Sequence, residues 1–209
     1  MVTYGEDLSR AIGLERFSVV WMVVEGVAAL GAGIAAHSLA LTGFGGDSLI
    51  ELLSAGVLLR RLELQRQGAD PALVEESEHR AERIAGVLLA LLAVYLMVSA
   101  VFEWFGPSRI KPSALGLAIS GLSAVLMPLL GRAKSRLGTT LASPALKVDA
   151  VESWVCAYMA WAALASTVAV GLFGWTWVDA TASLFIAFWV AREAIEAWRG
   201  EDECAEADH

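Results

Sequence analysis

The sequence contains few of the residues on which most soluble functions depend. Among its 209 residues there are two cysteines, Cys156 and Cys204, too few for a disulfide framework and too far apart for a CxxC metal or redox motif. Basic residues are also scarce, since 15 Lys and Arg face 23 Asp and Glu and leave a net charge of −8. This balance excludes the basic face that a nucleic-acid partner requires. HExxH, P-loop and nucleophile-elbow motifs are absent as well, so we expect no enzyme.

Apolar residues are abundant instead. They form 57% of the chain against 18% charged residues, a composition typical of a polytopic membrane protein. A helix that spans a bilayer needs roughly 20 apolar residues, and six segments approach or exceed that length when a few acids are tolerated. These are residues 17–36, 38–59, 84–102, 114–130, 141–171 and 175–190. The sequence therefore predicts an all-α integral membrane protein with six transmembrane helices.

The distribution of basic residues predicts how these helices are oriented. Thirteen of the 15 Lys and Arg fall on one side of the membrane, and only Arg109 and Lys111 fall on the other. By the positive-inside rule, both termini are then cytoplasmic. Residues 1–199 are expected to form one transmembrane domain, followed by a short acidic cytoplasmic tail at 200–209. For a short chain with no targeting segment, a bacterial inner membrane is the simplest location.

Acidic residues occur inside the predicted helices, where each costs about 2.5–3.5 kcal/mol to insert and so indicates a function. Asp47 and Glu51 lie four residues apart, which places both carboxylates on one helix face. Asp149, Glu152 and Cys156 repeat this geometry in helix 141–171. Neighbouring like charges in a low-dielectric medium repel, and they favour the binding of protons or a divalent cation. These spacings therefore indicate a cation site.

An internal similarity selects the residues that are expected to face one another. Five positions of helix 38–59 have a counterpart 105 residues later in the chain. Four of the pairs are identical residues, and the fifth pairs an Asp with a Glu. The pairs are Ser38/Ser143, Ala40/Ala145, Leu41/Leu146, Asp47/Glu152 and Ser48/Ser153. The same alignment sets Glu51 against Cys156. Transporters bind their substrates where such repeated elements meet near the middle of the membrane. The candidate ligands are therefore Asp47, Glu51, Glu152 and Cys156.

Three more acids are interpreted separately. Asp149 lies beside Lys147 near a helix end, which favours a salt bridge or a place on the access path over metal coordination. Glu25 has no acid one turn away, and we expect it to line the cavity, relay protons or bond a neighbouring helix. Asp149 and Glu25 are thus second-tier candidates. Asp179 is predicted to cap helix 175–190, at whose start it lies.

These residues also carry a resemblance to a known family. The run from Ser38 to Glu51 resembles the second helix of the cation diffusion facilitator family, and the run from Asp149 to Cys156 is similar to its fifth. Trp177-Val-Asp179 is similar to the start of its sixth helix, with Ala180 in place of proline. The resemblance covers essentially the whole chain. It implies a proton-coupled divalent-metal exporter, usually a homodimer, with a tetrahedral site between the second and fifth helices.

The chain departs from the family pattern in three respects. It has Glu51 where the family usually has a second Asp, and Glu152 and Cys156 where the family usually has His and Asp. The third departure is that no cytoplasmic metal-binding domain follows the last helix, so we expect a short form of the family.

The four candidate ligands limit which metals the site could bind but do not identify a single metal. Three carboxylates and one thiol suit Zn²⁺ or Cd²⁺, whereas Co²⁺, Fe²⁺ and Mn²⁺ stay open if Cys156 is only a small buried hydrophobe. We expect no resident cofactor, and the partners would be lipid, metal ions, protons and a second copy of the chain. A non-transporting metal sensor or subunit and a proton-coupled carrier of an organic cation are the alternatives. No Lys or Arg falls in the central part of a predicted helix to neutralise Asp47, Glu51 or Glu152, which favours a mobile cation.

Overall fold

The fold is a bundle of six long helices. The computed structural model describes residues 2–68, 72–105 and 110–207, and the side chains of most of them. The helices in chain order are α1 (Val2–Ala36), α2 (Leu39–Gln67), α3 (Ala72–Phe105), α4 (Ala114–Thr140), α5 (Pro144–Phe173) and α6 (Trp177–Ala207). No strand occurs in these described ranges. The all-α prediction is confirmed, and each predicted helix corresponds to one of the six.

In the part of the chain that the structure describes, four helices are long and apolar enough to cross a membrane. The candidate spans are Tyr4–Ala36, Val87–Phe105, Ala114–Thr140 and Ala145–Phe173. The charged residues of α2 and α6 lower their apolar character and leave them outside this set. Large apolar side chains such as Val94, Val98 and Phe102 of α3 are exposed on the outside of the bundle, as contact with lipid requires. The chain is therefore a multi-pass membrane protein.

The helices are longer than the apolar segments that predicted them. α1 has 35 residues and is about 52 Å long, whereas the hydrocarbon core of a bilayer is about 30 Å thick. The segments 60–67 and 131–140, expected to be loops, continue α2 and α4 as helix. Hydropathy identifies only the part of a helix that is apolar enough to lie in lipid, so it misses a polar extension of the same helix. α6 likewise continues through residue 207, so it includes most of the predicted tail; the side chains of that tail and residues 208–209 lie outside the described part.

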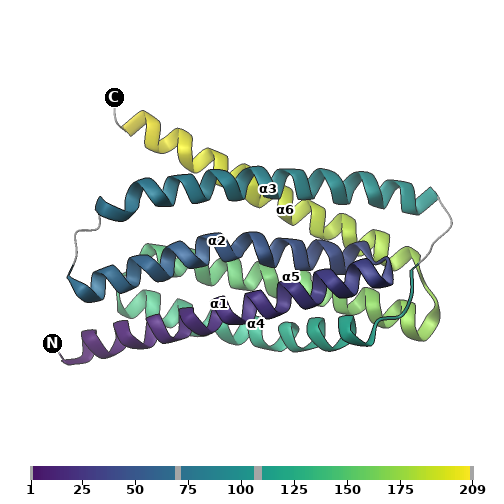
Figure 1. Cartoon of the computed structure of the whole chain (residues 1–209), viewed down its shortest axis with the longest axis horizontal. Coiled ribbons are helices and arrows are strands. Elements are labelled where there is room, and N and C mark those ends of the chain that lie inside the picture. The colour runs from purple at the N-terminus through teal and green to yellow at the C-terminus, as the bar shows by residue number, and fades with distance from the viewer. Residues whose placement is uncertain (1, 69–71, 106–109, 208–209) are drawn as a thin grey trace.

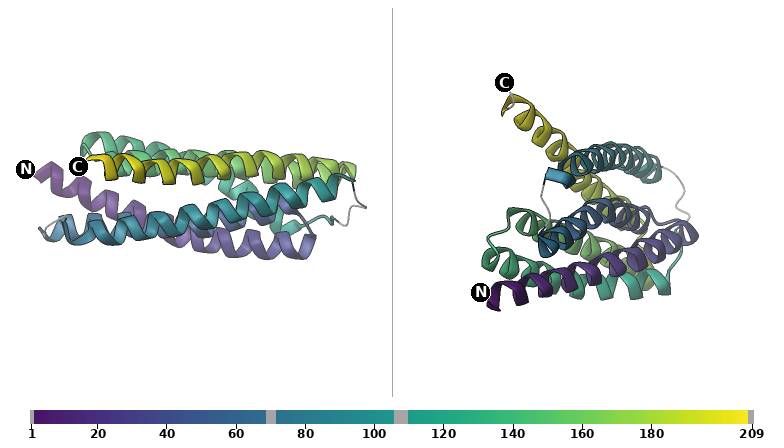
Figure 2. Two further views of the ribbon diagram at one scale, coloured as in Figure 1. Left: turned by 90° about the horizontal axis from the view of Figure 1, so that it is seen from above. Right: turned by 60° about the vertical axis from the view of Figure 1, so that its left-hand side comes forward.

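The helices form two groups, visible in Figure 1. α1, α2, α4 and α5 pack together, with α1 against α2 and α4, and α5 against α2 and α4. α3 and α6 pack on each other; α3 also lies against α2, and α6 against α5 and α2. All six run close to the long axis of the molecule (Figure 2). We call the end where α1 begins and α6 ends the basal end, and the opposite end the distal end.

Two helix turns confirm the alignment of α2 with α5. Ser38 and Ser143 are both N-caps, and their hydroxyls accept hydrogen bonds from Leu41 N and Leu146 N. The residue before each cap, His37 or Ala142, has a positive φ of 55° or 49°. The turn at Ser38 lies at the distal end and the turn at Ser143 at the basal end. α2 and α5 are therefore matched in register but run in opposite directions.

Candidate functional site

Asp47 of α2 is buried in the centre of the four-helix group. Its side chain is fully inaccessible to solvent, and Glu51, one turn further along α2, is 8% exposed. Among the described residues, Asp47 has no hydrogen-bonding partner other than the neighbouring Glu51 carboxyl. The ionisable groups that interact with Asp47 are three other carboxylates, those of Glu51, Glu152 and Glu25. The centre of the bundle thus concentrates acidic groups, as the spacing predicts.

Glu25 of α1 connects this centre to all four helices. The carboxylate is 0% exposed and accepts hydrogen bonds from Trp21 Nε1 at 2.6 Å and from Ser123 Oγ of α4 at 2.6 Å. Ser48 Oγ of α2 donates to it at 2.8 Å, and Cys156 Sγ of α5 at 3.4 Å. Every hydrogen-bond partner of Glu25 among the described residues is a neutral donor. The acid is therefore satisfied in hydrogen bonding but not neutralised by a base in the described part of the chain.

Cys156 lies at the same level of the bundle and faces the same acids. It is 1% exposed, and its sulfur lies 4.0 Å from Ser48 Oγ in addition to its contact with Glu25. Asp47, Glu51 and Glu25 are the carboxylates that act on it electrostatically. Cys156 of α5 therefore lies against Ser48 of α2 and Glu25 of α1, close to the α2 acids.

The four predicted ligands nevertheless do not form a closed metal shell. In the described residues, no group of three His, Cys, Asp or Glu side chains is close enough together to hold a metal ion. Cys156 donates its hydrogen bond to Glu25, and Glu152 is only partly buried. Asp47, Glu51, Glu152 and Cys156 share one interior region, and their role as a common ligand set stays a prediction.

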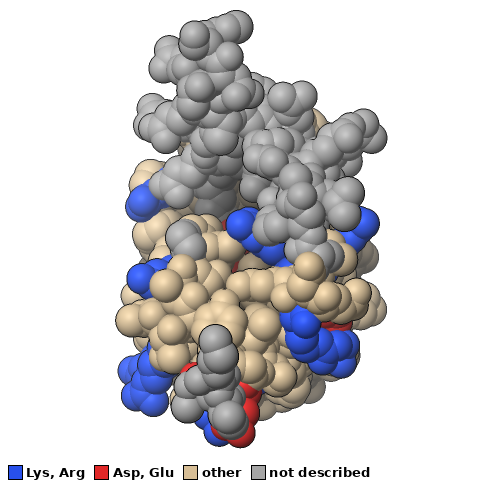
Figure 3. Space-filling model, turned by 90° about the vertical axis from the view of Figure 1, so that its left-hand side faces the viewer, with Lys and Arg blue, Asp and Glu red and all other residues tan. Residues whose placement is uncertain are grey.

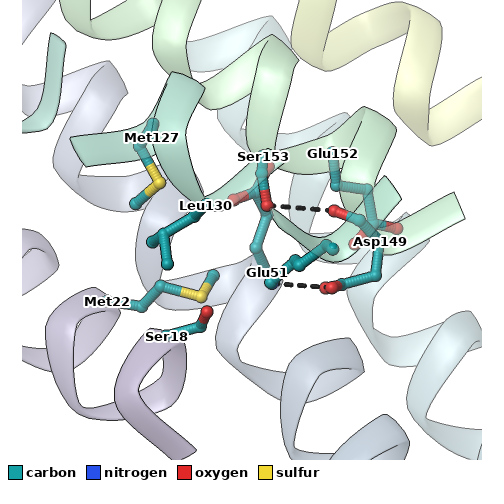
Figure 4. Close-up of a pocket in the computed structure, with 9 residues that line it drawn as sticks. Ser18, Met22, Glu51, Met127, Leu130, Asp149, Glu152 and Ser153 are labelled. Atoms are coloured by element: carbon teal, nitrogen blue, oxygen red, sulfur yellow. Dashed lines mark hydrogen bonds and ion pairs between the residues drawn. The ribbon is translucent and has the colours of Figure 1, made fainter. Parts of the chain in front are cut away.

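A small pocket lies beside this region, on its basal side. Figure 4 shows its lining, which four helices contribute: Ser18, Met22, Glu51, Met127, Leu130, Lys134, Asp149, Glu152 and Ser153. Ser18 and Met22 precede Glu25 along α1, which begins at the basal end. Ser153 precedes Cys156 along α5, which begins at the same end. The pocket therefore lies between the basal end and the centre around Asp47 and Glu25.

A buried ion triad borders the pocket. Lys134 Nζ of α4 lies 2.6 Å from Asp149 Oδ2 of α5 and 3.3 Å from Glu15 Oε2 of α1. All three side chains are at most 9% exposed. The salt bridge expected for Asp149 is present, but its partner is Lys134, because Lys147 points to the surface. The structure thus gives Asp149 a position beside the pocket, paired with a base.

Sequence reasoning missed Glu15 and Lys134 as part of the interior. Both lay outside the apolar segments 17–36 and 114–130, so they were counted as loop or flank residues. A signal was present nonetheless, since Glu15, Ser18, Met22 and Glu25 recur at helical spacing and share one face of α1. Extending the helical pattern beyond the apolar window would have revealed this face.

Asp179 organises the distal end, though not as predicted. Its buried carboxylate accepts hydrogen bonds from Leu39 N at 2.7 Å and Ala40 N at 3.3 Å, so it caps α2 and not α6. It also accepts from Ser38 Oγ at 2.6 Å and from Ser166 Oγ of α5 at 2.5 Å. The start of α6 is therefore joined by hydrogen bonds to the start of α2 and to α5 at the distal end.

The chain is similar in sequence to a known family of membrane proteins. A family model described as the cation efflux transmembrane domain matches residues 16–199. The chain is also similar to Transmembrane protein 163 of Xenopus laevis, with 27% identity over 161 residues that cover 75% of this chain and 54% of that protein. The chain thus spans about half the length of this relative.

Proposed function

Because the chain belongs to the cation diffusion facilitator family, whose transmembrane domain matches residues 16–199, we propose that this cation efflux transporter exchanges divalent transition metals for protons. Zn²⁺ and Cd²⁺ are the preferred substrates. The observation that carries the proposal is the centre around Asp47, where carboxylates from α1, α2 and α5 interact and no Lys or Arg of the described residues is among the groups that act on Asp47. Such a centre binds protons when no metal is present, since several buried negative charges otherwise repel one another.

The metal would bind between α2 and α5. Asp47, Glu51, Glu152 and Cys156 supply three oxygens and one sulfur, a set that suits tetrahedral Zn²⁺ or Cd²⁺. Because these groups share a region without forming a closed shell, metal binding is expected to draw α5 toward α2 and to move Cys156 from Glu25 to the metal. Glu25 would hold a proton or join the shell. If Cys156 stays with Glu25, the oxygen-rich remainder suits Mn²⁺, Fe²⁺ or Co²⁺.

The exchange follows from the requirement that ligands be deprotonated. Metal reaching the centre through the basal pocket displaces protons from the carboxylates. When the centre opens to the other side, the higher proton concentration there protonates the carboxylates again and releases the metal. The sum is a proton-coupled antiport directed out of the cytoplasm.

The same proposal includes the topology. All six helices cross the membrane and the basal end is cytoplasmic, an orientation supported by the Lys and Arg side chains that surround this end in Figure 3. Residues 1–199 act as the transport domain, the chain works as a homodimer, and the membrane is a bacterial inner membrane. The pocket lining contains no aromatic residue, which favours a metal ion over an organic cation as substrate.

The test is metal-driven proton movement in proteoliposomes with an internal pH dye, scanning Zn²⁺, Cd²⁺, Co²⁺, Fe²⁺ and Mn²⁺. Asp47→Asn keeps the shape of the side chain and removes its charge, and we expect it to abolish the signal. Glu63→Gln is the matched control, because Glu63 is a partly exposed acid on the same helix, paired with Arg16 at the surface. A wild-type protein that is folded but shows no signal with any metal would instead support a non-transporting sensor.

A further inference from the structure

The buried triad of Glu15, Lys134 and Asp149 lies on the side of the centre that faces the basal pocket. Lys134 and Asp149 both line the pocket, and Glu51 and Glu152 line it further in. A cation that moves through this pocket from the basal end toward the centre therefore passes the Lys134–Asp149 pair. Nothing in the transport cycle described above uses this pair.

The triad has an uneven charge. Two carboxylates share one ammonium group, so the cluster has a net charge of −1 when all three groups are ionised. The ammonium lies closer to Asp149, at 2.6 Å, than to Glu15, at 3.3 Å. The Lys134 ammonium, which is attached to α4, can therefore pair with either of two carboxylates, Asp149 on α5 or Glu15 on α1. If Asp149 is taken by another cation, Glu15 can keep the ammonium paired.

From this arrangement, and resting on the proposed function, we infer that Lys134 selects the charge of the substrate by exchanging with the incoming cation on Asp149. A divalent cation interacts about twice as strongly with a carboxylate as the ammonium does at equal distance, whereas a monovalent cation gains nothing by the exchange. Lys134 then moves toward Glu15 while the metal passes to Glu152 and Glu51. Lys134 would therefore be a specificity-determining residue, not a metal ligand.

The inference can be tested without metal. Ser153 lines the pocket and is 7% exposed, so Ser153→Cys, with Cys156→Ser and Cys204→Ser, reports on access to it. The rate of its reaction is measured in lipid nanodiscs with a cationic and an anionic thiosulfonate reagent of similar size. Because no metal is present, the labelling rate depends on the charge of the triad and not on transport. A failure of this test can therefore be told apart from a failure of the proposed metal–proton exchange, which the proteoliposome signal measures.

Lys134→Met makes the pocket more negative and should raise the ratio of cationic to anionic labelling by about tenfold. Asp149→Asn leaves Lys134 with Glu15 alone, makes the triad neutral and should lower the same ratio. Lys134→Arg should stay close to the parent. Arg16→Met is the matched control, since it removes a cation from an exposed pair at the same end and should leave the ratio unchanged.

The labelling ratio should rise in Lys134→Met and fall in Asp149→Asn, and this difference in direction distinguishes charge selection from a packing role. If the triad only holds helices together, both substitutions loosen the pocket, and labelling by both reagents rises equally in both variants. That outcome, or an unchanged ratio in both folded variants, overturns the inference. If Lys134→Met fails to fold, as judged by gel filtration, the fall in the ratio expected for Asp149→Asn still decides.

Discussion

The bundle contains two buried acidic centres that differ in how their charge is balanced. At the triad, Lys134 contacts both Asp149 and Glu15. The inner centre, around Glu25 and Asp47, lies further from the basal end. The described contacts of these two acids include serines, Trp21, Cys156 and other acids, but no Lys or Arg. A buried charge is stable only if it is paired or neutralised. The triad thus has its counter-ion within the protein, whereas no base is found among the described contacts of the inner centre, where we propose that protons or metal balance the charge.

The largest effect is expected when the counter-ion of the triad is removed. Lys134→Met leaves two buried carboxylates without their base and should lower the free energy of unfolding by about 3–5 kcal/mol. Chemical denaturation in detergent measures the change, with Arg16→Met as the surface comparison, for which a much smaller loss is expected. Equal losses for the two variants would show that the triad is no more stabilising than a surface pair.

Removing the whole triad should undo most of that loss. The variant with Glu15→Gln, Lys134→Met and Asp149→Asn has no buried charge at these positions, so its free energy of unfolding should return to within about 1–2 kcal/mol of wild type. The same denaturation experiment decides. A triple variant less stable than Lys134→Met alone would mean that packing, and not charge balance, explains the first result.

The inner centre should respond in the opposite way. Asp47→Asn removes an acid with no base among its described contacts, so stability should stay the same or rise by about 1 kcal/mol while transport is lost. Thermal unfolding and metal-driven proton movement are measured on the same preparation. A destabilised protein that still transports metal would reverse the distinction between the two centres.

The smallest effect concerns the sulfur. Cys156→Ser keeps a hydrogen-bond donor to Glu25 but replaces a soft ligand by a hard one, so Cd²⁺ transport should weaken about tenfold and Mn²⁺ transport should change little. Apparent affinities for the two metals in proteoliposomes provide the measurement. If both metals keep their affinities, Cys156 is a packing residue and the metal shell is made of oxygen alone.

Much of the fold could be predicted from the sequence, because apolar runs and helix-capping residues are patterns of neighbouring residues in the chain. Apolar runs located six helices, and the offset of 105 aligned Ser38 with Ser143, which the two turns confirm. Glu15 and Lys134 were missed, since hydropathy cannot follow a helix beyond its apolar part. The donors to Glu25 come from three other helices as well as from Trp21, and no spacing within α1 reveals how those helices are rotated.

In the proposed transport cycle, the inner centre exchanges protons for a divalent cation. Isothermal titration of Zn²⁺ into purified protein, repeated in buffers of different ionisation enthalpy, gives both the affinity and the number of protons released. Wild type is predicted to bind with proton release, Asp47→Asn to lose this binding, and Glu63→Gln to keep it. Unchanged binding and proton release in Asp47→Asn would show that the metal binds elsewhere and that the inner centre does not exchange protons for it.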